Sequence, residues 1–203
     1  MHDPEHWNRV YETKAPDAVS WYAPALTASL ALIQGAYLPG GAQLIDVGGG
    51  ASTLPRDLLA LGLRPTVLDI AQAAIDAARA QASDPDAVEW RVGDVTEISL
   101  PAARYHLWHD RAVFHFLTEP ADRARYVAHL RHALRPGGHV VLATFALDGP
   151  ERCSGLPVIR YDAAGLHGAL GPGFELTADR AERHITPWGS VQPFQYIRAR
   201  RVG

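Results

Sequence analysis

The sequence of 203 residues predicts an α/β fold built on one mostly parallel, doubly wound sheet. Short apolar segments alternate with helical patterns between residues 43 and 145, which is typical of parallel strands joined by right-handed helical crossovers. One of these strands, residues 43–47, runs directly into the glycine turn Gly48-Gly49-Gly50. The last two strand segments follow one another without a helix between them, so we expect an antiparallel hairpin at the end of the sheet.

Residues 1–36 are expected to form a helical, aromatic-rich cap. Trp7 and Tyr11 are four residues apart and therefore share one face of a helix. Trp21 and Tyr22 follow in an irregular stretch flanked by prolines, and we predict that they form a lid over a ligand pocket. The alternative is that these aromatic residues only attach the N-terminal helix to the body. A leucine and isoleucine stripe predicts a second helix within residues 25–36.

The expected core covers residues 40–145 and contains five strands and three helices. The predicted strands are residues 43–47, 65–68, 88–92, 105–109 and 139–145, and the predicted helices are residues 52–61, 71–81 and 120–134. Residues 146–203 should add a substrate loop, a short helix at 162–170 and the end hairpin from strands 174–183 and 192–200. With no repeat or low-complexity linker, we expect a single domain.

The composition narrows the classes of function. The apolar fraction of 47% and the charged fraction of 20% are typical of a globular domain, and the net charge of −3 argues against a nucleic-acid partner. Cys153 is the only cysteine, which excludes intramolecular disulfides and cysteine-based zinc sites, and we expect no metal. The polar, acidic N-terminus is unlike a signal peptide and no run of about 18 apolar residues exists, so we expect a cytoplasmic protein without a membrane partner.

The glycine turn is compatible with several ligand classes. A phosphate-binding loop needs a lysine that is absent here, and the dinucleotide pattern is broken by Thr53 at its sixth position. Asp46 would bring a negative charge toward a pyrophosphate but suits a ligand with a cationic part. Asp69 ends the second strand, where an acid accepts hydrogen bonds from a ribose diol. These features favour an adenosine-type ligand, unless Asp46 and Asp69 are only turn or capping residues.

The order of motifs resembles that of the class I S-adenosylmethionine-dependent methyltransferases over residues 40–145. The matching segments are Asp46-x-Gly48-x-Gly50, Val67-Leu68-Asp69-Ile70, Gly93-Asp94-Val95, Asp110-Arg111 and Leu134-Arg135-Pro136-Gly137-Gly138. The resemblance implies a Rossmann-like, seven-stranded sheet. Gly49 is a departure, because this family more usually has Cys, Ala or Pro at that position.

The same resemblance implies S-adenosylmethionine as the cofactor and assigns the residues around it. Asp46 and the backbone of Gly48, Gly49 and Gly50 would hold its amino-acid part. Asp69 would bind the ribose hydroxyls, and Ile70, Asp94 and Val95 would surround the adenine. His109, after the fourth strand, would lie close to the methyl group.

Four residues at or just after the end of the fourth predicted strand are candidates for catalysis. A sulfonium methyl is already activated, so the protein must mainly align the acceptor, and a base is needed only when the acceptor carries a proton. The candidates are His109, Asp110, Arg111 and His115. The alternatives are that Arg111 forms a salt bridge or contacts a helix end, that His115 is a structural histidine, and that His109 only lines the cofactor pocket. The segment Asp110-Arg111-Ala112 is similar to one in the thiopurine-type and tellurite-resistance-type methyltransferases, which act on small thiols and chalcogen species. The Asn-Pro-Pro-Tyr/Phe motif of many amide and nucleobase N-methyltransferases is absent, which argues against those substrates.

The loop at residues 147–157 is predicted to form the lip of the substrate pocket. Cys153 could contact a soft acceptor, although methyl transfer needs no enzyme thiol, and Arg160 and Tyr161 could close the same pocket. We therefore expect a methyltransferase that acts on a small molecule such as a thiol, a chalcogen compound or another heteroatom acceptor, as a monomer or homodimer. The alternatives are a protein lysine methyltransferase, a non-catalytic S-adenosylmethionine-binding module and an NAD-dependent oxidoreductase.

Overall fold

The computed structural model describes residues 3–203, so the first two residues of the predicted cap lie outside it. The helices of this part of the chain are α1 (Pro4–Thr13), α2 (Thr27–Gln34), α3 (Leu54–Ala60), α4 (Gln72–Gln81), α5 (Pro120–Ala133) and α6 (Ala163–Leu170), with short 3-10 turns at Pro16–Ala18 (η1), Pro85–Ala87 (η2) and Phe114–Phe116 (η3). The strands are β1 (Gln43–Val47), β2 (Arg64–Asp69), β3 (Glu89–Val92), β4 (Tyr105–Arg111), β5 (Leu134–Phe145), β6 (Arg152–Cys153), β7 (Leu156–Pro157), β8 (Phe174–Ile185) and β9 (Val191–Arg201).

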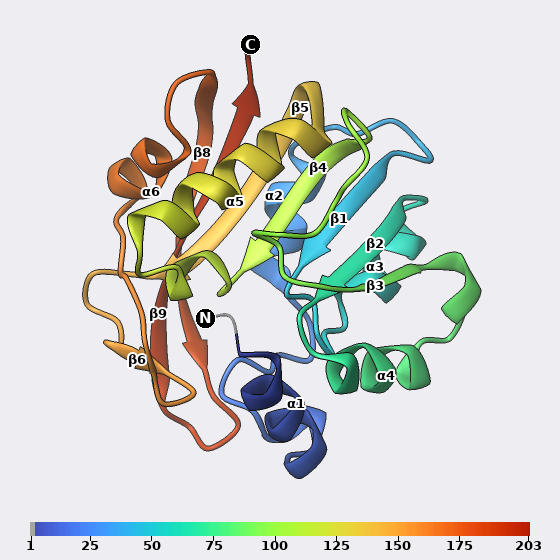
Figure 1. Ribbon diagram of the computed structural model, residues 1–203, viewed down its shortest axis with the longest axis vertical. Helices are drawn as coiled ribbons and strands as arrows, with labels where there is room; N and C mark the ends of the chain where they lie inside the picture. Colours follow the sequence, from blue (N-terminus) through green and yellow to red (C-terminus); the bar gives the residue numbers. More distant parts are fainter. Residues whose placement is uncertain (1–2) are drawn as a thin grey trace.

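Seven strands form one sheet in the order β3-β2-β1-β4-β5-β9-β8 (Figure 1). The pairings from β3 to β5 are parallel, whereas β9 is antiparallel to both β5 and β8. The predicted fold class, a mostly parallel seven-stranded sheet with a terminal antiparallel hairpin, is therefore confirmed.

Two segments differ from the sequence prediction. Residues 135–138 were expected to be a break after α5, but β5 already begins at Leu134, which pairs with Tyr105 of β4. An irregular register between Tyr105 and Leu107 and a positive φ of 75° at Gly137 accommodate this early start. The predicted loop at 147–157 contains the small antiparallel ribbon β6–β7.

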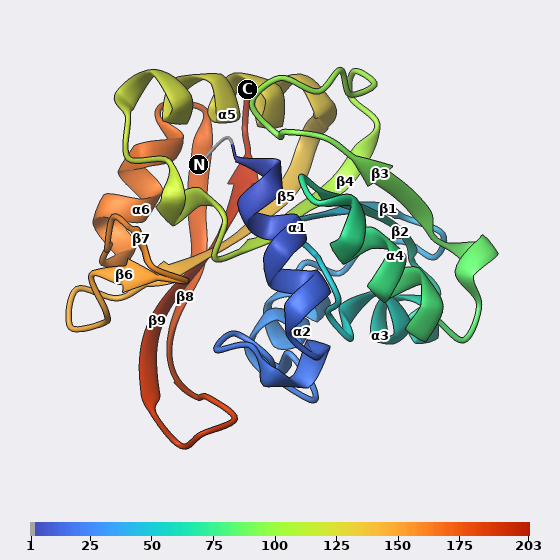
Figure 2. The ribbon, with the colours of Figure 1, turned by 60° about the horizontal axis from the view of Figure 1, so that its bottom comes forward.

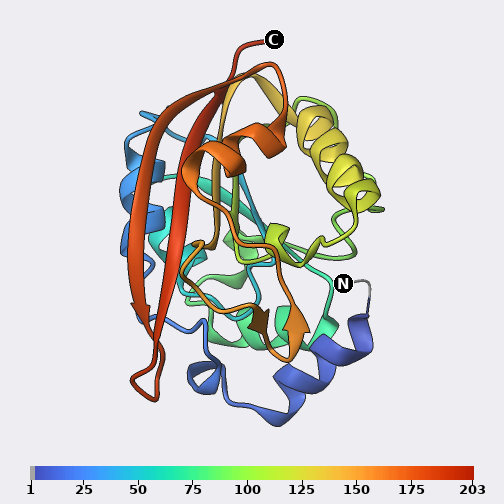
Figure 3. The ribbon, with the colours of Figure 1, turned by 90° about the vertical axis from the view of Figure 1, so that its left-hand side faces the viewer.

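Helices cover both faces of the sheet, as the edge view in Figure 3 shows. On one face, α2 and α3 bury leucine and isoleucine side chains against Leu44, Leu107 and Val141. On the other face, α5 and α6 pack against a cluster that includes Trp108 and Leu142. Between residues 3 and 203, no helix has the length and apolar character needed to cross a membrane.

The end of β4 sends neighbouring residues to opposite faces of the sheet. Side chains alternate along a strand, so His109 and Arg111 point to the face that carries α2, whereas Asp110 points toward α5. In the parallel register His109 lies directly beside Asp46 of β1. This register brings the imidazole and the carboxylate together at the carboxyl edge of the sheet.

A buried hydrogen-bond network anchors the Asp110 side of this strand end. The Tyr126 hydroxyl donates to Asp110 Oδ2 at 2.6 Å and accepts from Trp108 Nε1 at 2.8 Å. The backbone N–H groups of Val113 and Phe114 also donate to this carboxylate, at 2.9 and 3.1 Å. The network joins β4 to α5 and to the turn at η3, while burial raises the pKa of Asp110 to about 7.

Helix α1 lies apart from these two layers, across the carboxyl edge of the sheet (Figure 2). Asn8 of α1 accepts a hydrogen bond from the backbone N–H of Ala73 at the start of α4, at 2.9 Å. The side chain of Asp3 caps α1 by accepting from His6 N at 3.0 Å. The cap therefore places the aromatic face of α1 above the glycine turn.

We expect Tyr126→Phe to lower the free energy of unfolding by about 2–3 kcal/mol, because it leaves the Trp108 N–H without its buried acceptor and removes a donor from Asp110. Urea unfolding followed by tryptophan fluorescence measures this change. Tyr37→Phe is the matched control, because Tyr37 is 91% exposed and should change stability by less than about 0.5 kcal/mol. Equal effects of the two variants would contradict the role of the network.

Candidate active site

Two adjoining cavities lie at the carboxyl edge of the parallel strands, beneath α1. The aromatic cavity, of about 650 Å³, is lined by Trp7, Tyr11, Trp21, Val47, Gly48, Leu68, Asp69, Ile70, Gly93, Asp94, Val95, Arg111, Ala112, Val113, Phe116 and Cys153. The glycine-turn cavity, of about 500 Å³, is lined by Tyr11, Pro16, Val19, Trp21, Tyr22, Ala23, Leu26, Asp46, Gly48, Gly49, Ala51, Ser52, His109 and Arg111. The two cavities share Tyr11, Trp21, Gly48 and Arg111, so they form one continuous site.

The glycine turn is packed too closely for side chains. Gly48 has a φ of +65°, and its N–H donates to the carbonyl of Leu68 at 2.7 Å, which ties β1 to β2. A Cβ on Gly49 would lie 2.6 Å from Asp46 Oδ2, so the carboxylate fills the space that a larger residue would need. This contact explains why the chain has glycine at this position.

Asp46 is hydrogen-bonded through only one of its two carboxylate oxygens among the described residues. Its Oδ1 lies 2.7 Å from His109 Nδ1, and His109 Nε2 lies 2.9 Å from Ser29 Oγ of α2. Its Oδ2 is buried and has no hydrogen-bond partner among the described residues. A buried carboxylate oxygen without a donor is unfavourable, so this wall of the glycine-turn cavity suits a ligand that brings a cationic or N–H group.

His109 orients Asp46. The ring is 1% exposed and both of its nitrogens are engaged, by Asp46 and Ser29. The side chain lines the glycine-turn cavity, as expected for a residue of the cofactor pocket. With both nitrogens bonded inside the protein, His109 has no free atom to accept a proton from an acceptor.

Four of the remaining predicted cofactor residues line the aromatic cavity, whereas Gly50 lines neither cavity. Asp69 Oδ1 accepts from the N–H of Ala71 at 2.9 Å, and burial raises the pKa of this carboxyl to about 6. Asp94 Oδ1 accepts from the N–H and the hydroxyl of Thr96, both at 2.7 Å. Ile70 and Val95 supply apolar wall beside these carboxylates. Gly50 lies directly beneath the Tyr11 hydroxyl, which a Cβ on this glycine would strike.

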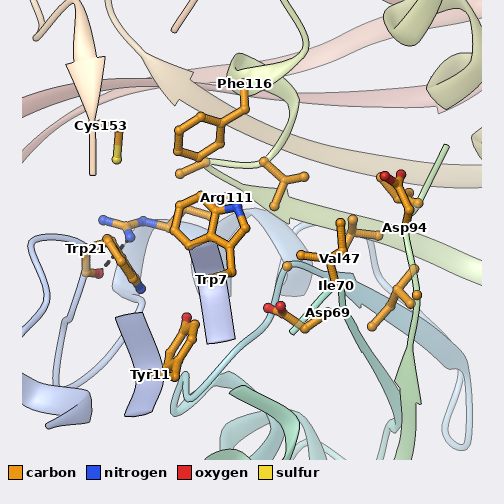
Figure 4. Close-up of a pocket in the computed structure, with 16 residues that line it drawn as sticks. Trp7, Tyr11, Trp21, Val47, Asp69, Ile70, Asp94, Arg111, Phe116 and Cys153 are labelled. Carbon is orange, nitrogen blue, oxygen red and sulfur yellow. Dashed lines mark hydrogen bonds between the residues drawn. The ribbon is translucent and has the colours of Figure 1, made fainter. Parts of the chain in front are cut away.

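Aromatic side chains cover the site. The Trp7 ring meets Trp21 and Phe116 edge-on, with centroids 5.9 and 5.2 Å away, and Tyr11 meets Trp21 at 6.3 Å (Figure 4). Trp21 lines both cavities and Tyr22 lines the glycine-turn cavity. The spacing of Trp7 and Tyr11 predicts a shared helix face, and this shared face is the signal in the sequence that could have added both residues to the predicted lid of Trp21 and Tyr22. No pattern in the sequence distinguished Phe116 from a core residue.

Two of the four catalytic candidates lie outside both cavities, which corrects the prediction for Asp110 and His115. Asp110 is fully buried on the opposite face of the sheet, in the network with Tyr126. His115 is also fully buried, accepts from the N–H of Phe145 at 3.4 Å and packs against that ring. Burial and the nearby charge of Arg111 lower the pKa of His115 to about 3, so its imidazole is neutral.

The predicted substrate lip is only partly at the site. Cys153 lines the aromatic cavity, and burial raises the pKa of its thiol to about 12, so it is not a thiolate nucleophile at neutral pH. Arg160 instead donates a hydrogen bond to the carbonyl of Gly149 and forms a salt bridge with Glu151. Tyr161 packs its ring against Phe114, at 5.9 Å between centroids. The prediction that Arg160 and Tyr161 close the pocket is therefore also corrected.

Arg111 is the cation of the site and lines both cavities. Its Nε donates to the Tyr196 hydroxyl at 2.8 Å, and its Nη1 donates to the carbonyl of Trp21 at 2.9 Å. In residues 3–203, no group of three or more His, Cys, Asp or Glu side chains is placed to hold a metal ion.

Comparisons with known proteins agree with this geometry. Residues 44–138 match the family described as "Methyltransferase domain". Nodulation protein S of Rhizobium tropici is 30% identical over 103 residues, which cover 51% of this chain and 43% of that protein. The chain thus spans less than half the length of the curated relatives it matches.

Solved structures share the fold. A structure from work on the conversion of a disulfide bond into a thioacetal group during echinomycin biosynthesis has a TM-score of 0.79 at 20% identity, covering 98% of this chain and 92% of that one. The N-methyltransferase NodS from Bradyrhizobium japonicum WM9, in complex with S-adenosylhomocysteine, has a TM-score of 0.70 at 16% identity, covering 87% and 85%.

We expect Gly49→Ala to destabilise the protein by about 1–3 kcal/mol, because the new methyl group must displace the Asp46 carboxylate from its place beside His109. Gly40→Ala is the matched control, since a Cβ at Gly40 has no atom within 4 Å. Thermal unfolding of both variants, read by circular dichroism, checks the prediction. A Gly49 variant as stable as the Gly40 variant would show that Asp46 moves at no cost.

Proposed function

We propose that the chain, whose residues 44–138 match the methyltransferase domain family, is a class I S-adenosylmethionine-dependent methyltransferase that binds S-adenosylmethionine and methylates a small molecule. The observation that carries the proposal is the set of three carboxylates, Asp46, Asp69 and Asp94, which lie at or just beyond the carboxyl ends of three adjacent strands around one glycine turn. A cationic, phosphate-free nucleoside suits this set better than a dinucleotide does, because a pyrophosphate would be repelled by Asp46.

The residues present fit this cofactor. The unpaired Oδ2 of Asp46 would receive its ammonium group, which supplies the missing donor. Asp69 would accept from the ribose hydroxyls, and Ile70 and Val95 would contact the adenine, whose amino group would face Asp94. When bound, the cofactor supplies a methyl group on a positively charged sulfur. His109 would hold Asp46 in position, and the aromatic cover would exclude water.

The acceptor side of the site supports a small molecule over a protein lysine. The aromatic cavity is covered by Trp7, Trp21 and Phe116 and contains the cation of Arg111. A lysine ammonium would need an acidic groove near Asp110, but that carboxylate is fully buried on the other face of the sheet. The relative NodS is described as an N-methyltransferase, which is consistent with a heteroatom acceptor.

Calorimetry with S-adenosylmethionine, S-adenosylhomocysteine and NAD tests the cofactor. We expect micromolar binding of the first two and none of NAD, and failure of the first two to bind would end the proposal. Asp69→Ala should weaken the binding of S-adenosylhomocysteine by roughly 1.5–3 kcal/mol, because it removes a charge-assisted hydrogen bond. A methylation screen over thiols, amines and carboxylates then separates an enzyme from a binding module, which would bind the cofactor without turnover.

The affinity for S-adenosylhomocysteine should also fall as the pH is lowered from 7 to 5. The raised pKa of about 6 means that Asp69 takes up a proton in this range, and a protonated carboxyl is a weaker acceptor for the ribose hydroxyls. Calorimetry across this range measures the effect, which should be absent in Asp69→Asn. A wild-type affinity that is independent of pH would place the ribose away from Asp69.

A further inference from the structure

We propose that Arg111 binds the acceptor, and that this acceptor is a flat, mostly apolar molecule carrying an anionic group, a thiolate or a carboxylate. The proposal rests on the proposed function, which it deepens by giving the acceptor a charge and a binding partner. It starts from the one nitrogen of Arg111 that the protein itself leaves without a hydrogen bond.

The guanidinium of Arg111 is fixed in place before any ligand arrives. Its Nε and Nη1 donate to the Tyr196 hydroxyl and the Trp21 carbonyl, and its central carbon lies 4.3 Å from the centroid of the Phe194 ring. The side chain is only 6% exposed. A buried, immobilised guanidinium loses little further entropy when an anion binds to it.

The third nitrogen, Nη2, is buried and has no hydrogen-bond partner among the described residues. The carboxylate oxygen Glu182 Oε2 lies 3.8 Å from Nη2, which is too long for a hydrogen bond. That oxygen already accepts from the Tyr196 hydroxyl at 2.8 Å, and the Glu182 side chain is 23% exposed. Arg111 is therefore only partly compensated, and a buried donor of this kind stabilises an acceptor oxygen or sulfur that reaches it.

The position of Arg111 connects it with the acceptor side of the site. Figure 4 shows Arg111 and Cys153 on one side of the aromatic cavity, whereas Asp69, Ile70 and Asp94 lie on the other side. The carboxylates thus gather where the cationic cofactor is proposed to bind, and the only arginine among the lining residues of either cavity lies across from them. The apolar rings of Trp7 and Phe116 between these charges suit a flat molecule.

Apart from Asp69 and Asp94, which the proposed cofactor would occupy, the described residues that line the same cavity include no group suited to remove a proton. Both nitrogens of His109 are bonded, and Asp110 and His115 lie outside the cavity. Burial raises the pKa of Tyr11 and Cys153, so neither is a base at neutral pH. An anionic acceptor needs no base: its lone pair forms the bond to the methyl carbon, the sulfur keeps the electron pair of the broken S–C bond, and both products leave without a proton transfer.

The test measures binding of two aromatic anions, 4-nitrothiophenolate and 4-nitrobenzoate, to the protein saturated with S-adenosylhomocysteine, by calorimetry. The neutral thioether 4-nitrothioanisole is the control ligand. We expect Arg111→Gln to weaken the better-bound anion about tenfold or more and to leave the thioether unchanged, because only the anions gain a charge-assisted hydrogen bond. Arg111→Lys keeps the charge but loses the forked geometry, so its affinity for the anion should lie between that of the wild type and that of Arg111→Gln.

Glu182→Gln tests the same idea without altering Arg111. This isosteric change keeps an oxygen for the Tyr196 hydroxyl and removes the negative charge that competes for Nη2, so the anion should bind about threefold more tightly. If Arg111→Gln fails to fold, the anion affinity of Glu182→Gln tests the proposal. A preference for the thiolate assigns a sulfur acceptor and a preference for the carboxylate assigns an oxygen acceptor, and each supports the proposal.

The proposal is overturned if neither anion binds to the loaded protein, or if the anion affinity is the same in the wild type and in Glu182→Gln. Binding of S-adenosylhomocysteine, measured first on each protein, separates this failure from failure of the proposed function. A wild-type protein that does not bind S-adenosylhomocysteine contradicts the cofactor assignment itself. A protein that binds it normally but shows no dependence on Arg111 or Glu182 contradicts only the anion site.

Discussion

The alternation of side chains at the end of β4 is the constraint on which the site depends. The Tyr126 hydroxyl and the backbone N–H groups that follow Asp110 donate hydrogen bonds to its carboxylate, so the register of β4 cannot shift by one residue. Its neighbours His109 and Arg111 are consequently presented on the opposite face, where one meets Asp46 and the other meets Trp21. A buried residue with no place in the pocket thus fixes the positions of two residues that line it.

The charges of the site are separated by the topology of the sheet. Strands β1 and β2 each end on or next to an acid, and β3 is followed by one, so the carboxylates gather on that side of the site. Strand β4 is next in the sheet and ends on Arg111, which contacts β9 through Tyr196. The aromatic cavity therefore carries carboxylates on one side and a guanidinium on the other.

The sequence predicted much of the fold because local patterns and the long-range pairing agree. Residues 43–47 were assigned to the same strand that the structure shows, and the glycines and acids after the strands indicated the pocket. It could not resolve which of the adjacent residues His109, Asp110 and Arg111 face the pocket, because that depends on the register with β1 and on Tyr126. The positions of Arg160 and Tyr161 also depend on long-range contacts, because Arg160 is bonded to Gly149 and Glu151 and Tyr161 packs against Phe114. Contacts of α1 with the pocket depend on packing against α4, which no local pattern reports.

The position of α1 has a kinetic consequence. Tyr11 abuts Gly50 and Trp7 spans the cavity between Trp21 and Phe116, so one ten-residue helix supplies wall to both halves of the site. Its Asn8 provides a hydrogen bond to the body, at the start of α4. For the proposed ligands we therefore expect exchange to require detachment of this helix, so that their residence time depends on how often α1 opens rather than on the affinity of any one contact.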